Sequence, residues 1–230
     1  MQNTKGPWKF NASLAAEFER HISQSIPGYE LVHELISVYS ANFLNFGSVV
    51  IDLGCSSGKV ASYLLEDNKG KDITYLGIDN EPEMIRFCTE RYSEKSSCSF
   101  VCEDIVEYEL PQSNLVISVF TLQFMVLGHR RKILEKIFAS LAPGGGLILF
   151  EKTISDCSKL QDLNSTSLLD VKKRRGLTDA EIINKVFSLR GVMRPQLESV
   201  LVDEIKGAGF TQCHPIFKSL GFSGYLAFRD

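Results

Sequence analysis

An apolar run that leads directly into a glycine-rich turn is the strongest chemical signal in the chain: Val49-Val-Ile-Asp-Leu-Gly54-Cys-Ser-Ser-Gly58. Gly54 has no Cβ, so it lets the backbone turn sharply and approach a ligand. A helix that begins after this turn presents free N–H groups to an anion such as a carboxylate. The segment predicts a ligand site at the carboxyl end of a first strand, although any doubly wound sheet can contain such a turn.

The spacing of this turn is Asp-x-Gly-x-x-x-Gly, from Asp52 to Gly58. Ser56 stands where a dinucleotide-binding turn has the glycine that admits a pyrophosphate, and no Gly-Lys-Ser/Thr follows. The spacing therefore disfavours a nicotinamide dehydrogenase and a P-loop nucleotide hydrolase.

Acidic residues follow the next two strand-like runs. Asp79 and Asn80 end one run, and a carboxylate there can accept hydrogen bonds from both hydroxyls of a ribose. Asp104 and Ile105 follow another, where Asp104 can accept from an adenine amino group while Ile105 packs on the ring. Each acidic residue alone is more often a solvated loop or cap residue. Three loops at one sheet edge predict a nucleoside site.

Short apolar runs alternate with helical patterns through the middle of the chain, which is typical of right-handed βαβ crossovers. A last helix is followed by two strand-like runs that read as a hairpin. The predicted fold is α/β: a Rossmann-like, doubly wound, mainly parallel seven-stranded sheet with a C-terminal antiparallel hairpin and helical lid segments. The predicted strands are 48–52, 73–78, 99–102, 114–119, 146–150, 213–217 and 224–228.

We expect a single domain over residues 1–230. Within it, we assign residues 1–46 to a helical lid broken at Pro27-Gly28, and 47–152 to the βα core. Residues 153–195 form a helical insertion, and 196–230 hold the last helix and hairpin. The lid and the insertion are candidates for selecting the substrate, with plain structural packing as the alternative.

The chain has 230 residues, with 25 Lys+Arg against 28 Asp+Glu and hence a formal net charge of −3. This balance argues against direct nucleic-acid binding, which usually needs a basic excess. The six cysteines form no CxxC pair, so we expect reduced thiols and no metal. No apolar run is long enough for a membrane span, and no signal peptide is evident, so we expect a cytoplasmic protein.

Beyond these features, the chain resembles class I S-adenosylmethionine-dependent methyltransferases over roughly residues 20–230. Within that superfamily it is most similar to the carboxy-S-adenosylmethionine synthases, a family of tRNA wobble-uridine modification. The matching stretches are Gln24-Ser-Ile-Pro-Gly-Tyr29, Asp52-Leu-Gly-Cys-Ser56, Ile78-Asp-Asn-Glu-Pro-Glu-Met-Ile85, Phe120-Thr-Leu-Gln-Phe124, Pro143-Gly-Gly145 and Glu151-Lys152.

This resemblance implies S-adenosyl-L-methionine as the cofactor and a homodimer as the assembly. It places Tyr29 at the amino-acid end of the ligand, beside Gly54. The expected cofactor-binding residues are Tyr29, Asp52, Gly54, Cys55, Ser56, Asp79, Asn80, Asp104, Ile105 and Val119, with Phe124 and Arg190 expected at the substrate.

Two positions depart from the synthase pattern. The arginine that clamps the extra carboxylate in that family is Val186 here, with Arg190 one helical turn on, and an asparagine on the fourth strand is Val119. A valine cannot pair with a carboxylate, and a bidentate arginine contact is not simply replaced. Our main expectation is therefore methyl transfer to a small-molecule or carrier-bound acceptor. The alternatives are carboxy-S-adenosylmethionine synthesis from prephenate and S-adenosylmethionine, and a non-catalytic nucleoside-binding module.

A hydroxyl acceptor would also need a general base. The candidates are His21, His33, His129 and Glu151. His129 also fits a solvated helix start, His33 a packing role and Glu151 a salt bridge. The basic run Lys172-Lys-Arg-Arg175 fits a solvated helix face, with docking of an acidic partner as the alternative.

Overall fold

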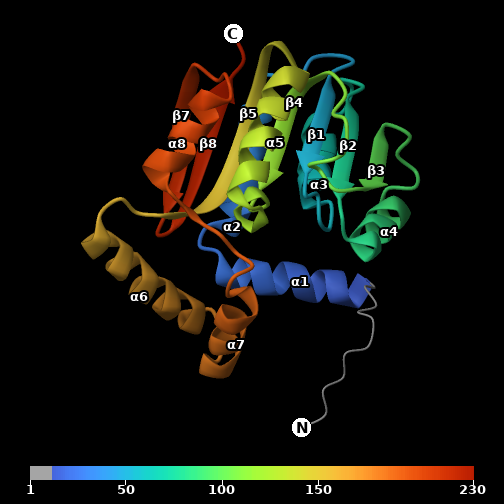
Figure 1. Ribbon diagram of the computed structural model, residues 1–230. Helices are drawn as coiled ribbons and strands as arrows, with labels where there is room; N and C mark the ends of the chain where they lie inside the picture. The colour runs from blue at the N-terminus through green and yellow to red at the C-terminus, as the bar shows by residue number, and fades with distance from the viewer. Residues whose placement is uncertain (1–11) are drawn as a thin grey trace.

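The computed structural model describes residues 12–230 and contains one large mixed sheet (Figure 1). Seven strands follow the order β3-β2-β1-β4-β5-β8-β7, and the first five in that order are parallel. β8 is antiparallel to both β5 and β7, which is the predicted hairpin. The strands are β1 (Val49–Leu53), β2 (Thr74–Asp79), β3 (Cys98–Cys102), β4 (Ser113–Val119), β5 (Leu141–Ile154), β7 (Gln212–Ser219) and β8 (Phe222–Phe228).

The predicted seven-stranded, mainly parallel sheet with its C-terminal hairpin is confirmed. Two details differ from the prediction. β5 extends well beyond the predicted 146–150 at both ends, and a two-residue strand β6 (Gln196–Leu197) pairs in parallel with its far end at Thr153 and Ile154. A strand this short carries no periodic signal, so only its partner in the folded chain defines it.

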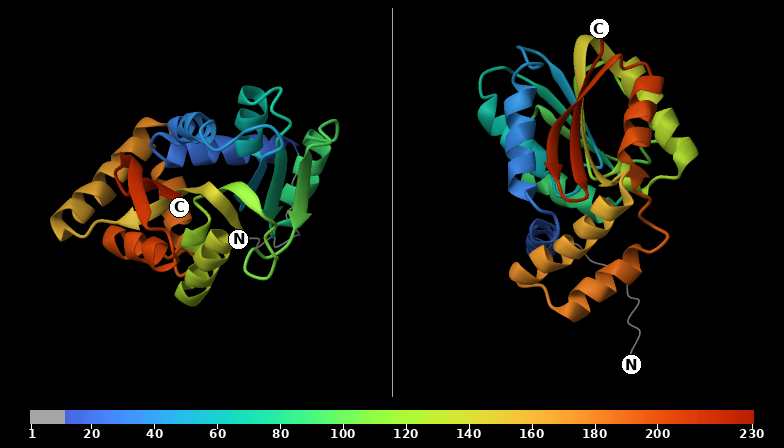
Figure 2. Two further views of the ribbon diagram at one scale, coloured as in Figure 1. Left: turned by 90° about the horizontal axis from the view of Figure 1, so that it is seen from above. Right: turned by 90° about the vertical axis from the view of Figure 1, so that its left-hand side faces the viewer.

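Helices cover both faces of the sheet, giving three layers (Figure 2). One face packs on α2 (Tyr29–Ser40) and α3 (Lys59–Asp67), and the other on α5 (Leu127–Ser140) and α8 (Glu198–Gly207). Consecutive residues of a strand pack into the hydrophobic cores on opposite faces of the sheet: Val50 belongs to the first hydrophobic cluster and Ile51 to the second. Because neighbouring side chains of a strand point to opposite faces, a sheet covered on both sides requires such continuous apolar runs.

Three further helices lie across the edge of the sheet where the parallel strands end (Figure 1). They are α1 (Ala12–Ser25), α6 (Ser158–Arg174) and α7 (Asp179–Leu189). We call them the lid helices. The predicted break between α1 and α2 falls at Gly28, whose φ of 74° is a left-handed conformation that favours glycine. Residues 1–11 of the predicted lid lie outside the described residues. The remaining helix, α4 (Pro82–Arg91), packs beside β2 and β3.

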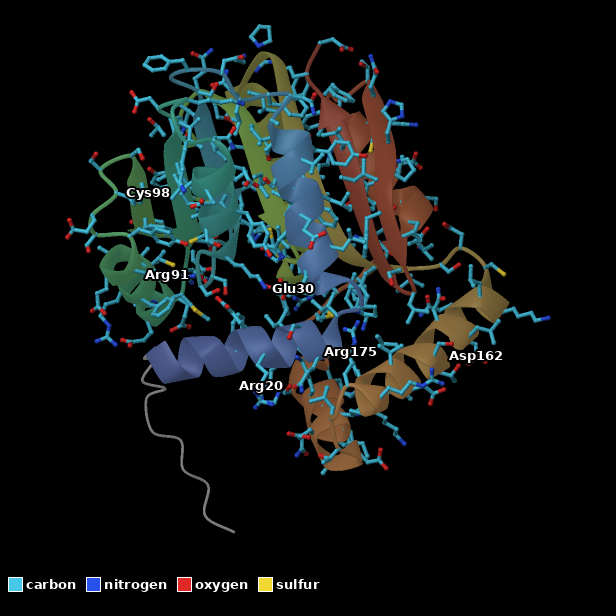
Figure 3. All side chains as sticks on the ribbon, turned by 180° about the vertical axis from the view of Figure 1, so that it is seen from behind. Arg20, Glu30, Arg91, Cys98, Asp162 and Arg175 are labelled. Carbon is cyan, nitrogen blue, oxygen red and sulfur yellow. The ribbon has the colours of Figure 1, made fainter. Side chains whose placement is uncertain are left out.

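Arg175 joins two lid helices that are far apart in the sequence (Figure 3). Its Nη1 donates hydrogen bonds to the carbonyl oxygens of Ser23, at 2.7 Å, and Ile26, at 2.9 Å. The Gln24 side chain donates in return to the Arg175 carbonyl at 3.0 Å. Hydrogen bonds from a guanidinium to carbonyls are stronger than neutral ones, so this contact ties the end of α6 to the end of α1.

No helix within residues 12–230 is both long and apolar enough to cross a lipid bilayer.

Replacing Arg175 with alanine is expected to loosen the lid without unfolding the sheet. Losing charge-assisted hydrogen bonds costs about 2 kcal/mol, which raises the population of the locally open state by about tenfold or more. Limited proteolysis between α1 and α2, and hydrogen exchange of the α1 amides, measure this. Arg174→Ala, at the neighbouring position, is the matched control. Arg174 is exposed, and its side chain makes no hydrogen bond or ion pair within residues 12–230. Equal protection of α1 in the two variants would contradict the role of Arg175.

Candidate active site

A cavity of about 740 Å³ lies between the carboxyl ends of the parallel strands and the lid helices. Its volume is in the range of small-molecule and cofactor sites. Every residue predicted to bind the cofactor lines it, and Phe124 and His33 line it too. The predicted cofactor-binding residues on its wall are Tyr29, Asp52, Gly54, Cys55, Ser56, Asp79, Asn80, Asp104, Ile105 and Val119.

The turn after β1 is fixed to the end of β2 through its backbone. The N–H groups of Gly54 and Cys55 both donate to the carbonyl of Ile78, at 2.8 and 3.1 Å. Gly54 has a φ of +74°, and a Cβ built on it would lie 2.3 Å from Oγ1 of Thr121. Glycine is therefore required twice over, by the conformation and by the loop after β4 that approaches it.

The two loops that follow β1 and β2 are held together by Asp79. One carboxylate oxygen accepts from the Ser56 N–H and the other from the Glu81 N–H, each at 2.9 Å. A carboxylate has about four lone-pair positions, so two remain for the hydroxyls of a ribose. Asp104 is exposed on the next loop, where one of its oxygens accepts from the Val106 N–H at 2.9 Å. Ile105 beside it is buried.

Buried polar groups lie beneath the turn. Asp52 is almost fully buried and accepts a hydrogen bond from the Tyr75 hydroxyl, and burial raises the pKa of Asp52 to about 7. A hydrogen bond to Cys88 and burial raise the pKa of the Cys55 thiol, so the thiol stays protonated.

Tyr29 and His33 pack against each other on the first turn of α2. Their rings meet edge to face at 4.6 Å, and the Lys59 ammonium lies 4.6 Å from the centre of the Tyr29 ring. Nδ1 of His33 is 2.9 Å from the Tyr29 carbonyl oxygen. Burial lowers the pKa of His33 to about 4, so the imidazole is neutral at pH 7 and a poor base. Its packing role is the better supported of the two.

Glu151 does not line the cavity, and its position assigns it to the support of the loop after β4. The side chain is 1 % exposed, and Oε1 accepts from the Leu122 N–H at 2.9 Å. Buried Arg130 donates to the Leu122 carbonyl at 2.9 Å. Burial raises the pKa of Glu151 to about 8. Both polar groups of the Leu122 backbone are therefore held by the buried side chains of Glu151 and Arg130.

Arg190 does not reach the cavity either. It follows the last residue of α7, and its guanidinium lies 5.8 Å from the centre of the Phe187 ring. Val186 on the same helix is 53 % exposed. Arg190, which we predicted to contact the substrate, therefore lies outside the cavity of this chain. Val186, the position aligned with the family arginine, does not line the cavity either.

Four lysines that the sequence analysis did not assign to the site line the cavity: Lys59, which pairs with Glu30, and Lys152, Lys172 and Lys185. The basic run containing Lys172 is not one surface, because Lys173 pairs with Asp179 at 2.8 Å and Arg175 ties the lid. The interpretation of that run as a solvated face is wrong at Lys172, which lines the cavity, while docking of an acidic partner stays a prediction. Leu168, four residues earlier, also lines the cavity, so helical periodicity is the signal that would have found this face.

Comparison with known proteins identifies the class. Residues 50–145 match the methyltransferase domain family. Human N-acetylserotonin methyltransferase, solved in complex with S-adenosylmethionine, has the same fold with a TM-score of 0.58 and 19% identity, over 93% of this chain and 56% of that one. The apo methyltransferase SibL gives a TM-score of 0.64 at 14% identity, again over 93% and 56%. Together with the relatives named next, the family match makes this chain an S-adenosylmethionine-dependent enzyme of the methyltransferase type.

More similar relatives narrow the family. The carboxy-S-adenosyl-L-methionine synthase of Shewanella piezotolerans is 32% identical over 96% of this chain and 93% of its own length. That of Histophilus somni is 30% identical over 97% and 94%. The chain belongs to the carboxy-S-adenosyl-L-methionine synthase family. Its cavity fits the cofactor, since Gly54 leaves open the space that a Cβ would fill and Asp79 keeps free acceptor positions.

Gly54→Ala is expected to weaken S-adenosylmethionine binding about a hundredfold. The new Cβ collides with Thr121, so the two loops that meet over the cofactor must separate. Isothermal calorimetry with S-adenosylhomocysteine measures the loss.

Gly47→Ala is the matched control for this variant. Gly47 has nearly the same φ, +76°, but a Cβ there would meet nothing within 4 Å. The Gly47→Ala variant has the same conformational cost of a left-handed alanine, about 1 kcal/mol. We expect it to bind S-adenosylhomocysteine like the wild type. Equal loss of binding in both variants would show that strain, and not the collision, is responsible.

Glu151 is expected to give stability a measurable pH dependence. Its folded pKa of about 8 lies above its ordinary value, so the folded state holds the proton more tightly than the unfolded one. This contribution is complete below about pH 4 and is lost as the pH rises through about 8. Compared with Glu151→Gln, the wild type should lose free energy of unfolding over that interval. Urea unfolding from pH 5 to 8 tests this, and parallel curves for the two proteins would contradict it.

Proposed function

We propose that this chain makes carboxy-S-adenosylmethionine from S-adenosylmethionine and a small carboxylate-bearing donor, for which the family resemblance implies prephenate. Its similarity to relatives that carry the synthase name supports the proposal, because the match runs over nearly the whole chain and includes the lid helices.

The observation that carries the proposal is that the chain's own lid helices cover part of the cavity beyond the cofactor loops. Beyond the cofactor loops, the wall is formed by apolar side chains and lysines of the lid helices, β5 and β8. The apolar residues on this side include Ile22, Leu168, Leu189 and Phe222. Arg175 ties the lid shut at one end. Such a compartment beside the cofactor loops suits a second small molecule.

S-adenosylmethionine supplies an activated, sulfonium-bound methyl group. The chain's residues bind the reactants, orient them and exclude water from the space between them. Val119, at the end of β4, gives that space an apolar wall. His33 is neutral and tightly packed, so we assign no proton transfer to it.

Methyl transfer to a small acceptor is the second candidate, and one observation favours it. Val119 and Val186 stand where the synthase family has asparagine and arginine, so two side chains of that pattern are missing. We rank it second, because the family relationship supports the synthase reaction more strongly.

Incubating the purified protein with S-adenosylmethionine and prephenate tests the proposal. We expect a sulfonium product heavier than S-adenosylmethionine by the mass of CO2, formed only when prephenate is present. Mass spectrometry of the nucleoside fraction detects it, with Gly54→Ala as the inactive control. Formation of S-adenosylhomocysteine with small acceptors, and no carboxylated product, would favour the second candidate.

A further inference from the structure

We infer that Lys152, Lys172 and Lys185 form a binding site for a dicarboxylate, with the three ammonium groups facing the second substrate. We call these residues the lysine cluster. The identification of that dicarboxylate as the carboxyl donor rests on the proposed function, but the site itself does not.

The cluster is assembled from three separate elements at the lid side of the cavity. Lys152 comes from β5, Lys172 from the last turn of α6 and Lys185 from α7. Nζ of Lys185 donates to the Ser25 hydroxyl of α1 at 3.0 Å, which fixes one member against a third lid helix. The charges of Lys152 and Lys185 both act on Lys172 and lower its pKa further than burial alone, to about 8. The three ammonium groups therefore share one space.

No carboxylate among residues 12–230 neutralises the cluster. The acidic side chains that line the cavity lie on the loops after β1, β2 and β3, which face the cofactor: Asp52, Asp79, Glu81, Glu103 and Asp104. The cluster lysines take part in none of the ion pairs recorded for the described residues. Burial lowers the pKa of all three. Like charges that are part-buried without counter-charges destabilise the protein, and a bound anion removes that cost.

The charge count indicates the class of ligand. Three ammonium groups that line one cavity without a counter-charge from the described residues match a ligand that carries at least two negative charges. Lysines act as point charges on flexible stems, so three of them can converge on two carboxylates from different directions. The apolar neighbours Leu168 and Phe222 leave room for a hydrocarbon body between those carboxylates and the cofactor.

Calorimetry on the protein loaded with S-adenosylhomocysteine tests the site, with prephenate and succinate as probes. Each of K152M, K172M and K185M is expected to weaken prephenate binding about tenfold or more, with S-adenosylhomocysteine binding unchanged. K173M is the matched control, one residue along the same helix but exposed and paired with Asp179. Cluster variants that bind prephenate like the wild type would overturn the site, as would a wild type that binds neither probe.

A product assay separates this inference from the proposed function. Dicarboxylate binding that depends on the lysines, without carboxylated product, would remove the proposed reaction and leave the site standing. Product formation with an unchanged KM for prephenate in the cluster variants would support the proposed reaction and overturn the lysine site.

Thermal unfolding without ligand gives an independent readout. Because the ammonium groups repel one another, K172M is expected to raise the Tm of the ligand-free protein while it abolishes stabilisation by prephenate. A lysine with a merely structural role would lower the Tm when replaced. A lower Tm together with unchanged stabilisation by prephenate would overturn the inference.

Discussion

The close approach of two loops, at Gly54 and Thr121, is the constraint on which the site depends. The chain builds β1, β2 and β3 outward in one direction and then returns to place β4 on the other side of β1. The loops after β1 and β4 therefore leave adjacent strands side by side and lead to helices on opposite faces of the sheet. Open α/β sheets bind their ligands at this point. Glu151 and Arg130 hold the β4 loop from below through the Leu122 backbone, so buried hydrogen bonds beneath the loop fix the loop that approaches Gly54.

The sequence predicts those parts of the molecule that local physics determines. The β1 turn needs glycine because of its own backbone conformation, and the core strands need apolar residues on both faces because helices cover both. Asp79 and Asp104 are predictable in position because parallel strands end at one edge. Gly54, Asp79 and Asp104 all lie on the cavity wall. Which hydrogen bonds they make to the cofactor stays a prediction.

Other features depend on how distant segments meet, and no local pattern contains that information. Glu151 follows a buried strand in the sequence, yet only the folded chain shows that its oxygen turns toward Leu122 and away from the cavity. Lys185 lies on α7 and Arg190 directly follows that helix. Only the way α7 packs on the cavity shows that Lys185 lines it and Arg190 does not. In the basic run, Lys172 lines the cavity, Lys173 pairs with Asp179 and Arg175 bonds to the end of α1, so the density of charge did not reveal these separate roles.

A net charge of −3 conceals a strong internal polarity. Carboxylates line the side of the cavity that is predicted to hold the nucleoside, while the lid side carries the three lysines. Inside a cavity charges interact more strongly than at an open surface. Under the proposed function, an anionic second substrate would be repelled from the predicted nucleoside side and attracted to the lysines. The arrangement orients the substrate before any contact specific to its shape is made, which is what a transfer between two small molecules requires.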